Sequence, residues 1–236
     1  MLTFGTETEV AASVSSAGTA AVTVMKNSGD LYLVPLDSRS GQTTGVTRRL
    51  TQDGRLKYLA AVGGEPRNAY FFASSSIGEG TRDCNALDLN SGAQALLVPK
   101  LDSTVGLAVS RDGRQIAYSV PEGDSYSIRV GDAGADPSTA RQLCRSCGLV
   151  RRFSPDGRFL LYSPEVQPKP NGLKRTIRLR EVASGNDRPW MEHPTESVTT
   201  AGFDEDGARL AIAVYPAGSA QTSKAYLVPW REGRCR

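Results

Sequence analysis

The chain has 236 residues, of which 39% are hydrophobic and 22% charged, and its formal net charge is +3. This length suits one large all-β or α/β domain, and the composition excludes both a disordered chain and a strongly charged one that coats nucleic acid. No apolar run reaches the ~18 residues of a membrane-spanning helix, so we expect no insertion into a membrane. The single histidine, His193, excludes a metal site that needs two imidazoles.

A turn motif recurs along the chain. The clearest copy is residues 153–162, FSPDGRFLLY, and related copies are residues 109–118 and 203–212. Two weaker copies begin at Val14 and Val62, so the leading apolar residues of successive copies are 48, 47, 44 and 50 residues apart. Such spacing is typical of the blades of a β-propeller and exceeds the ~34 residues of a helical hairpin repeat.

The motif predicts a β-hairpin. Proline presets φ at the first turn position, aspartate accepts hydrogen bonds from backbone amides, and glycine adopts the left-handed conformation that closes the turn. The strand after the turn is continuously apolar, as in residues 160–162, which is expected where both faces of a sheet are covered. Third extended segments follow at 30–37, 84–89, 126–130, 176–180 and 225–229, and fourth segments at 47–51 and 140–144.

These elements predict an all-β fold, a β-propeller of about five four-stranded, blade-like repeats in a single domain over residues 1–236. The sequence leaves two alternatives for the ends of the ring. Residues 1–8 complete the last blade and close the ring, because Leu2-Thr3 resembles Leu50-Thr51 ahead of the second repeat, or the chain is part of a larger ring. The expected repeats are residues 9–52, 53–100, 101–144, 145–194 and 195–236.

The turn motif, together with residues 29–37 and 48–51, resembles the WD-type repeats of TolB-like β-propellers. Residues 141–148, RQLCRSCG, are more narrowly similar to propellers that follow serine/threonine kinase or winged-helix domains in bacteria. The resemblance implies a propeller fold and a location on the extracytoplasmic, periplasmic side of a bacterial membrane. It does not assign an activity, because propellers have many unrelated functions.

Cys144 and Cys147 form the sharpest local motif. Two thiols at this spacing are compatible with a turn of structural cysteines, with a disulfide, or with half of a zinc or redox site. A complete zinc site would need Cys84, Cys235 or His193, all of which lie far away in the sequence. We therefore predict no metal site and no cofactor, and leave a disulfide as the second alternative.

No catalytic motif is present in the sequence. It contains no Gly-x-Ser-x-Gly elbow, no phosphate-binding glycine-rich loop and no kinase signature. The only imidazole base, His193, precedes a proline, so a Ser-His-Asp triad is disfavoured. We therefore predict that the chain is not an enzyme.

Positive charge is concentrated in residues 141–180, where ten basic and two acidic side chains give +8, so the rest of the chain sums to −5. In a propeller, the loop that enters a blade and the loop between its second and third strands open on one face, which places Arg145 near residues 168–174. The candidate binding residues are Arg145, Arg151, Lys169, Lys174 and Arg175. The alternative is that these are scattered, solvated arginines and lysines. Few aromatic residues are interleaved, which disfavours nucleic acid as a partner.

The leading functional hypothesis is a non-catalytic propeller that binds a protein or peptide as a sensing or scaffolding module. The basic patch is compatible with an acidic peptide, a phosphate-bearing ligand or an anionic surface. The alternative is the regulatory or gating propeller of a larger enzyme, such as a bacterial serine/threonine kinase or a prolyl-oligopeptidase-like peptidase. A third hypothesis is a truncated propeller that has lost its function.

Overall fold

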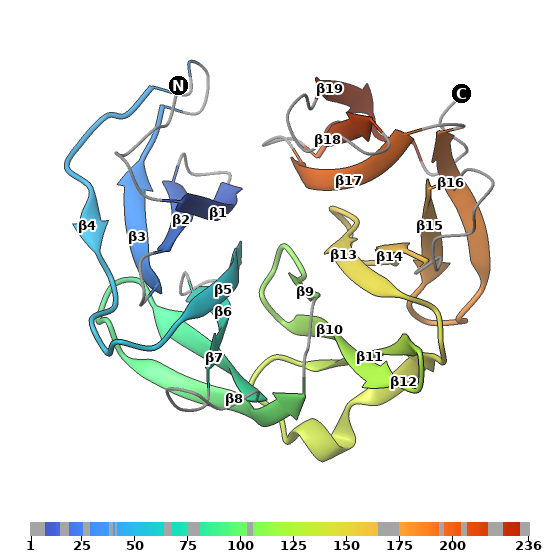
Figure 1. Cartoon of the computed structure of the whole chain (residues 1–236), viewed down its shortest axis with the longest axis horizontal. Coiled ribbons are helices and arrows are strands. Elements are labelled where there is room, and N and C mark those ends of the chain that lie inside the picture. The colour runs from blue at the N-terminus through green and yellow to red at the C-terminus, as the bar shows by residue number, and fades with distance from the viewer. Residues whose placement is uncertain are drawn as a thin grey trace.

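The computed structural model describes residues 8–14, 19–25, 29–37, 40, 42–63, 68–74, 81–102, 106–164, 175–193, 196–203, 207–216 and 224–231. Within these ranges the strands form five antiparallel sheets arranged around a common axis (Figure 1). The first strand of each sheet lies nearest the axis, and the later strands lie progressively further out (Figure 1). The predicted all-β propeller is therefore confirmed.

The five sheets follow one another in chain order. The first contains β1 (Thr8–Val14), β2 (Thr19–Met25), β3 (Gly29–Pro35) and β4 (Arg48–Arg49), and the second contains β5 (Lys57–Gly63), β6 (Asn68–Ser74), β7 (Thr81–Asp88) and β8 (Gln94–Asp102). The third contains β9 (Leu107–Val109), β10 (Gln115–Glu122), β11 (Ser125–Asp132) and β12 (Arg141–Cys144). The fourth contains β13 (Leu149–Phe153), β14 (Phe159–Ser163), β15 (Arg175–Glu181) and β16 (Asp187–His193).

The fifth sheet has three strands within the described residues, β17 (Glu196–Phe203), β18 (Arg209–Pro216) and β19 (Lys224–Pro229). The predicted fourth strand of this sheet, from residues 1–8, falls almost entirely outside the described part of the chain, which begins at Thr8. The closure of the ring therefore stays a prediction. Outside the strands, a single 3-10 turn at Pro137–Thr139 is the helical element of the described ranges.

The predicted turn chemistry is present at two corners with the same contacts. At 153–159, the Ser154 amide donates to the Phe159 carbonyl (2.8 Å) and the Gly157 amide donates to the Ser154 carbonyl (2.9 Å), with Gly157 at a φ of 72°. In the third sheet, the Ser110 amide donates to the Gln115 carbonyl and the Gly113 amide to the Ser110 carbonyl, both at 2.9 Å. One short sequence motif thus builds the hairpin between the first and second strands of both sheets.

The core consists of layers of apolar side chains between neighbouring sheets. Second strands carry continuously buried runs, as in Ala69–Ala73 of β6 and Phe159–Tyr162 of β14, because each sheet is covered on both faces. Alternate residues of these strands pack toward the preceding and the following sheet. Around the ring, the four layers include Leu31 and Phe71, then Phe72 and Tyr118, then Ile128 and Leu160, and finally Leu161 and Leu210.

Candidate functional site

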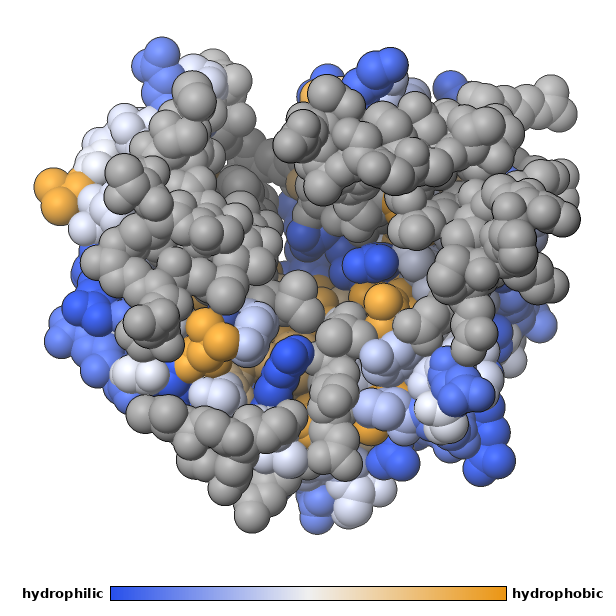
Figure 2. Space-filling view, in the orientation of Figure 1, coloured by the Kyte–Doolittle hydropathy of each residue, from blue (hydrophilic) through white to orange (hydrophobic). Residues whose placement is uncertain are grey.

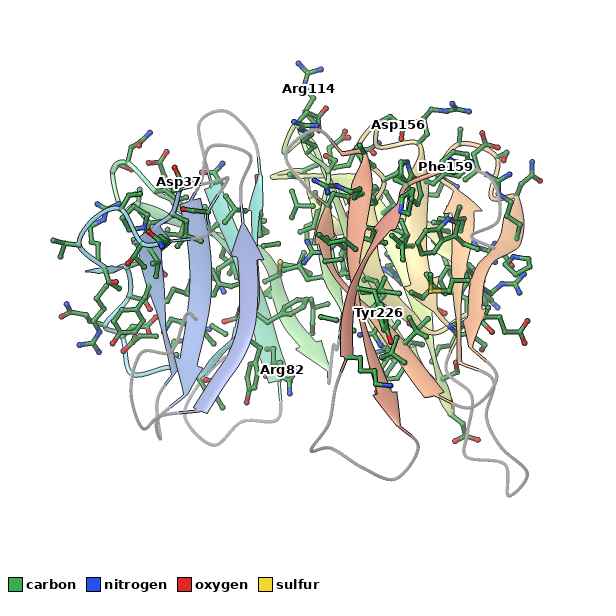
Figure 3. The ribbon with its side chains drawn as sticks, turned by 90° about the horizontal axis from the view of Figure 1, so that it is seen from above. Asp37, Arg82, Arg114, Asp156, Phe159 and Tyr226 are labelled. Atoms are coloured by element: carbon green, nitrogen blue, oxygen red, sulfur yellow. A yellow bond between two sulfur atoms is a disulfide. The ribbon has the colours of Figure 1, made fainter. Side chains whose placement is uncertain are left out.

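The two faces of the ring carry different loops (Figure 3). Arg114 and Asp156, in turns between first and second strands, mark one face, and Asp37, just after β3, lies on the same side (Figure 3). Arg82, near the start of β7, lies toward the opposite face, where second strands connect to third strands (Figure 3). We call this opposite face the loop face, and define it by the segments 122–125 and 144–149 and by the two ends of the segment 164–174.

Arg145 lies on the loop face, in the link from β12 to β13. Its side chain is 77% exposed, and its Nε lies 3.6 Å from Oε1 of Glu122, at the end of β10. An ion pair this exposed contributes about 0–1 kcal/mol, because water and salt screen it. The guanidinium of Arg145 can therefore exchange Glu122 for a carboxylate or phosphate of a ligand at little cost.

A disulfide joins Cys144 and Cys147 within the same link. The backbone amides of Cys147 and Gly148 both donate to the Tyr126 carbonyl, at 2.9 and 3.0 Å. Ser146, between the two cysteines, has a φ of 45°, a left-handed conformation that is uncommon for a residue other than glycine. The link is thus tied to β11 by hydrogen bonds and to itself by a covalent bond, which holds Arg145 on a constrained support.

Arg151 is half-buried on β13, and its Nε donates to Oγ of Ser163 at 3.0 Å. In the register of the fourth sheet, Leu149 is opposite Ser163, so β13 begins where β14 ends. Arg175 starts β15 and is opposite His193, at the same end of the sheet. Lys169 and Lys174 lie outside the described residues. The sheet therefore brings Arg145, Arg151 and both ends of the 164–174 segment to one face.

Arg152 is one of the ten basic residues of the 141–180 stretch but is not among the binding residues predicted from the sequence. It lies on β13, the strand of its sheet nearest the axis, and faces the fifth sheet, where a Cβ atom on Gly202 would be 3.8 Å from its guanidinium carbon. Its Nε is shielded from solvent and has no hydrogen-bond partner. Burial lowers the pKa of Arg152 to about 10, so the guanidinium is still protonated at neutral pH. A comparison of equivalent repeat positions would have singled this residue out.

Metal ligands are not gathered anywhere in the described ranges: no group of three or more histidine, cysteine, aspartate or glutamate side chains is placed to hold an ion. Cys84 is a free, buried thiol whose pKa is raised to about 12 by burial. It therefore stays protonated and unreactive in the folded chain. Among the helical elements described, none is long and apolar enough to pass through a bilayer.

The fold resembles several solved structures. TolB from Acinetobacter baumannii aligns with a TM-score of 0.62 and 14% identity, over 97% of this chain and 56% of that one. A putative TolB from Agrobacterium tumefaciens aligns with a TM-score of 0.72 and 14% identity, over 97% of this chain and 79% of that one. A prolyl endopeptidase aligns with a TM-score of 0.58 and 13% identity, over 95% of this chain and 34% of that one.

These alignments show a TolB-like β-propeller fold, as the sequence resemblance predicts. The chain spans about half the length of the Acinetobacter TolB, and the identities are too low to transfer an activity. A scan of the sequence against protein-family models finds no match, and a search of the curated proteins finds none either. The narrower resemblance to kinase-associated propellers stays a prediction.

Proposed function

We propose that this propeller is a non-catalytic module that binds an acidic protein or peptide on its loop face. The observation that carries the proposal is the position of Arg145, which is 77% exposed on a link constrained by the Cys144–Cys147 disulfide. A backbone that is already constrained in the free chain loses less conformational freedom on binding, so more of the interaction energy appears as affinity. Arg151, Lys169, Lys174 and Arg175 are the proposed companions of Arg145.

Charge patterning supports an acidic partner. Residues 141–180 carry +8 against −5 for the rest of the chain, so the fourth repeat and its borders attract anions although the whole chain is nearly neutral. The proposal includes a location outside the cytoplasm, which the Cys144–Cys147 disulfide favours, because disulfides persist in oxidising compartments.

The test is binding of a labelled glutamate-rich peptide, measured by fluorescence anisotropy at low and at physiological salt. We expect the variant Arg145→Ala/Lys169→Ala/Lys174→Ala to bind about tenfold more weakly, since three exposed ion pairs at about 0.5 kcal/mol each sum to about 1.5 kcal/mol. Added salt should weaken binding by the unaltered chain and have a smaller effect on the variant.

The control is Arg114→Ala/Arg158→Ala, which removes exposed arginines from turns on the opposite face. This double variant should bind the peptide within about twofold of the unaltered chain, because its charges lie far from the loop face. Equal weakening in both variants would show that only overall charge matters, and unchanged binding by the triple variant would remove the site assignment.

A second candidate is the regulatory propeller of a larger enzyme, favoured by the structural alignment with about one third of a prolyl endopeptidase chain. In that case the loop face or its opposite would meet a catalytic domain encoded in the same reading frame. Sequencing the gene on both sides of this segment tests the idea. A continuous frame that encodes a peptidase or kinase domain would favour it over an independent binding module.

A further inference from the structure

The innermost strands carry one large charged side chain at a position that is otherwise small. The residues just before the leading apolar residue of each repeat are Ser13, Ala61, Ala108, Arg152 and Gly202. In the second, third and fourth sheets these residues pair with Tyr70, Ala117 and Leu161. The repeats are thus equivalent in register, and Arg152 is the exception among the five.

Register and packing show where the Arg152 side chain points. Arg152 is paired with Leu161, which belongs to the apolar layer shared with the fifth sheet, whereas the next pair, Phe153 and Leu160, belongs to the layer shared with the third sheet. Arg152 therefore points toward β17, near the axis of the ring. Gly202 of β17 lies beside the guanidinium, because a Cβ at this position would be in van der Waals contact with Arg152, 3.8 Å from its guanidinium carbon.

No counter-ion for Arg152 is found among the described residues. Its Nε is completely shielded and unpartnered, although the residue as a whole is partly accessible. Burial disfavours the charged form, which is the cause of the lowered pKa. Lys57 differs from Arg152: it is fully buried, but its Nζ contacts the carboxylates of Asp53 and Asp30.

We propose that Arg152 is the anchor of a second binding site, near the propeller axis between β13 and β17, that takes a carboxylate. A guanidinium can donate two parallel hydrogen bonds from its terminal nitrogens to one carboxylate, which would neutralise the charge. A single arginine balances the one negative charge of a planar carboxylate. A phosphate carries more negative charge and is better balanced by several cations. The site lies next to the turn at 154–158, away from Arg145, so it does not depend on loop-face binding.

Four peptide probes of identical length distinguish the two sources of a carboxylate. One pair differs only at the C-terminus, which is a free carboxyl group in one peptide and an amide in the other. The second pair is amidated at the C-terminus and carries either glutamate or glutamine in the centre. Binding is measured by calorimetry and by the change in Tm. We expect one carboxylate probe, or both, to bind and raise the Tm of the unaltered chain, and its neutral partner to have no effect.

Two variants separate a binding role from a structural one. Arg152→Met should bind the carboxylate probe more than tenfold more weakly than the unaltered chain does. Without ligand, its Tm should be about 2–4 °C higher, because an apolar side chain replaces a buried charge. Gly202→Val should weaken binding of the probe while keeping the charge of Arg152, because the valine side chain lies beside the guanidinium. Arg114→Ala, which removes an exposed arginine that belongs to neither proposed site, is the control and should bind the probe normally.

Several results would overturn the proposal. A fall in Tm for Arg152→Met would show that the guanidinium has a structural partner in the folded chain. Equal probe binding by Arg152→Met and the unaltered chain would place the carboxylate elsewhere. Binding of inorganic phosphate in preference to all four peptides, or no binding of any peptide at millimolar concentration, would likewise exclude a carboxylate site at Arg152.

Discussion

At the scale of single residues, the junction of the first two sheets contains a network of charges around the buried Lys57 and Asp30. Lys57 is fully buried at the start of β5, where its Nζ contacts Asp53 and lies 3.8 Å from Oδ1 of Asp30. Asp30 also pairs with Arg49 and accepts a hydrogen bond from Oγ1 of Thr51 at 3.0 Å. Burial opposes ionisation of Asp53, but the hydrogen bonds from Lys57 and from the Arg55 amide outweigh it and lower its pKa.

This network predicts a large difference between two charge deletions. Lys57→Met should destabilise the chain by about 2–4 kcal/mol, because it leaves the buried Asp30 carboxylate and Asp53 without their shared cation. Arg145→Ala, which removes an exposed partner of Glu122, should cost less than about 1 kcal/mol. Urea unfolding of both variants measures the free energies, and similar losses for the two would contradict the assigned role of Lys57.

The pH dependence of the stability follows from carboxyl groups whose pKa is lowered in the folded chain. The pKa of Asp112 is lowered by hydrogen bonds from the Ser110 hydroxyl and the Arg114 amide. A carboxyl group whose pKa is lower in the folded than in the unfolded state stabilises the fold above the unfolded pKa of about 4, and this contribution is lost as the pH falls through the folded value. Asp53 acts in the same direction, so acid weakens the turns and the Lys57 network together.

At the scale of elements, the turn between first and second strands is repeated, but its surroundings are not. Gly157 and Gly207 occupy the same turn position in the fourth and fifth repeats, with φ values of 72° and 73°. A Cβ on Gly157 would have its nearest contact at 4.0 Å, on Gln115. A Cβ on Gly207 would be 2.7 Å from Cβ of Pro155 in the preceding turn, closer than real Cβ atoms approach.

We therefore expect Gly207→Ala to be more damaging than Gly157→Ala. Both variants strain a left-handed backbone conformation, which costs about 1 kcal/mol. Gly207→Ala must also displace the Pro155 turn, which adds about 1–3 kcal/mol of overpacking. Thermal unfolding of the two single variants gives the comparison. If the two lose equal stability, the turns of the fourth and fifth repeats are not in the contact described.

At the scale of the whole molecule, the outer edge of the fifth sheet bears on how the ring closes. The fifth sheet ends in β19 without a fourth strand among the described residues, and Tyr226 and Leu227 of β19 are 47% and 60% exposed. Figure 2, viewed along the axis, shows apolar residues at the surface beside strongly hydrophilic ones rather than a continuous apolar patch. Among the described residues, no strand pairs with the outer edge of β19, and this edge is where the predicted strand from residues 1–8 would pair.

Deletion of residues 1–7 tests this closure. If Leu2-Thr3 belongs to a strand beside β19, the deletion should lower the Tm by several degrees and expose a strand edge through which copies associate. Light scattering after size exclusion measures the association. Deletion of residues 232–236 is the control and should leave the Tm and the monomer unchanged. An unaltered monomer after deletion of 1–7 would favour the larger ring.

Much of the architecture is determined locally, and the sequence alone shows it. The Ser-Pro-Asp-Gly turn at 154–157 needs only proline, an accepting carboxylate and a glycine at positive φ, so the motif predicts its own hairpin wherever it recurs. The apolar runs of β6 and β14 likewise report that both faces of a sheet are covered. The repeat spacing then predicts the ring.

The binding residues depend on contacts that no local pattern contains. Arg145 and Arg152 are both basic and seven residues apart, yet one is exposed beside Glu122 and the other lies between two sheets opposite Gly202. Local sequence determined the strands, their turns and the repeat, because backbone geometry and side-chain alternation act over a few residues. Only the tertiary structure decided which charges have partners, because burial and pairing are set by residues from different sheets.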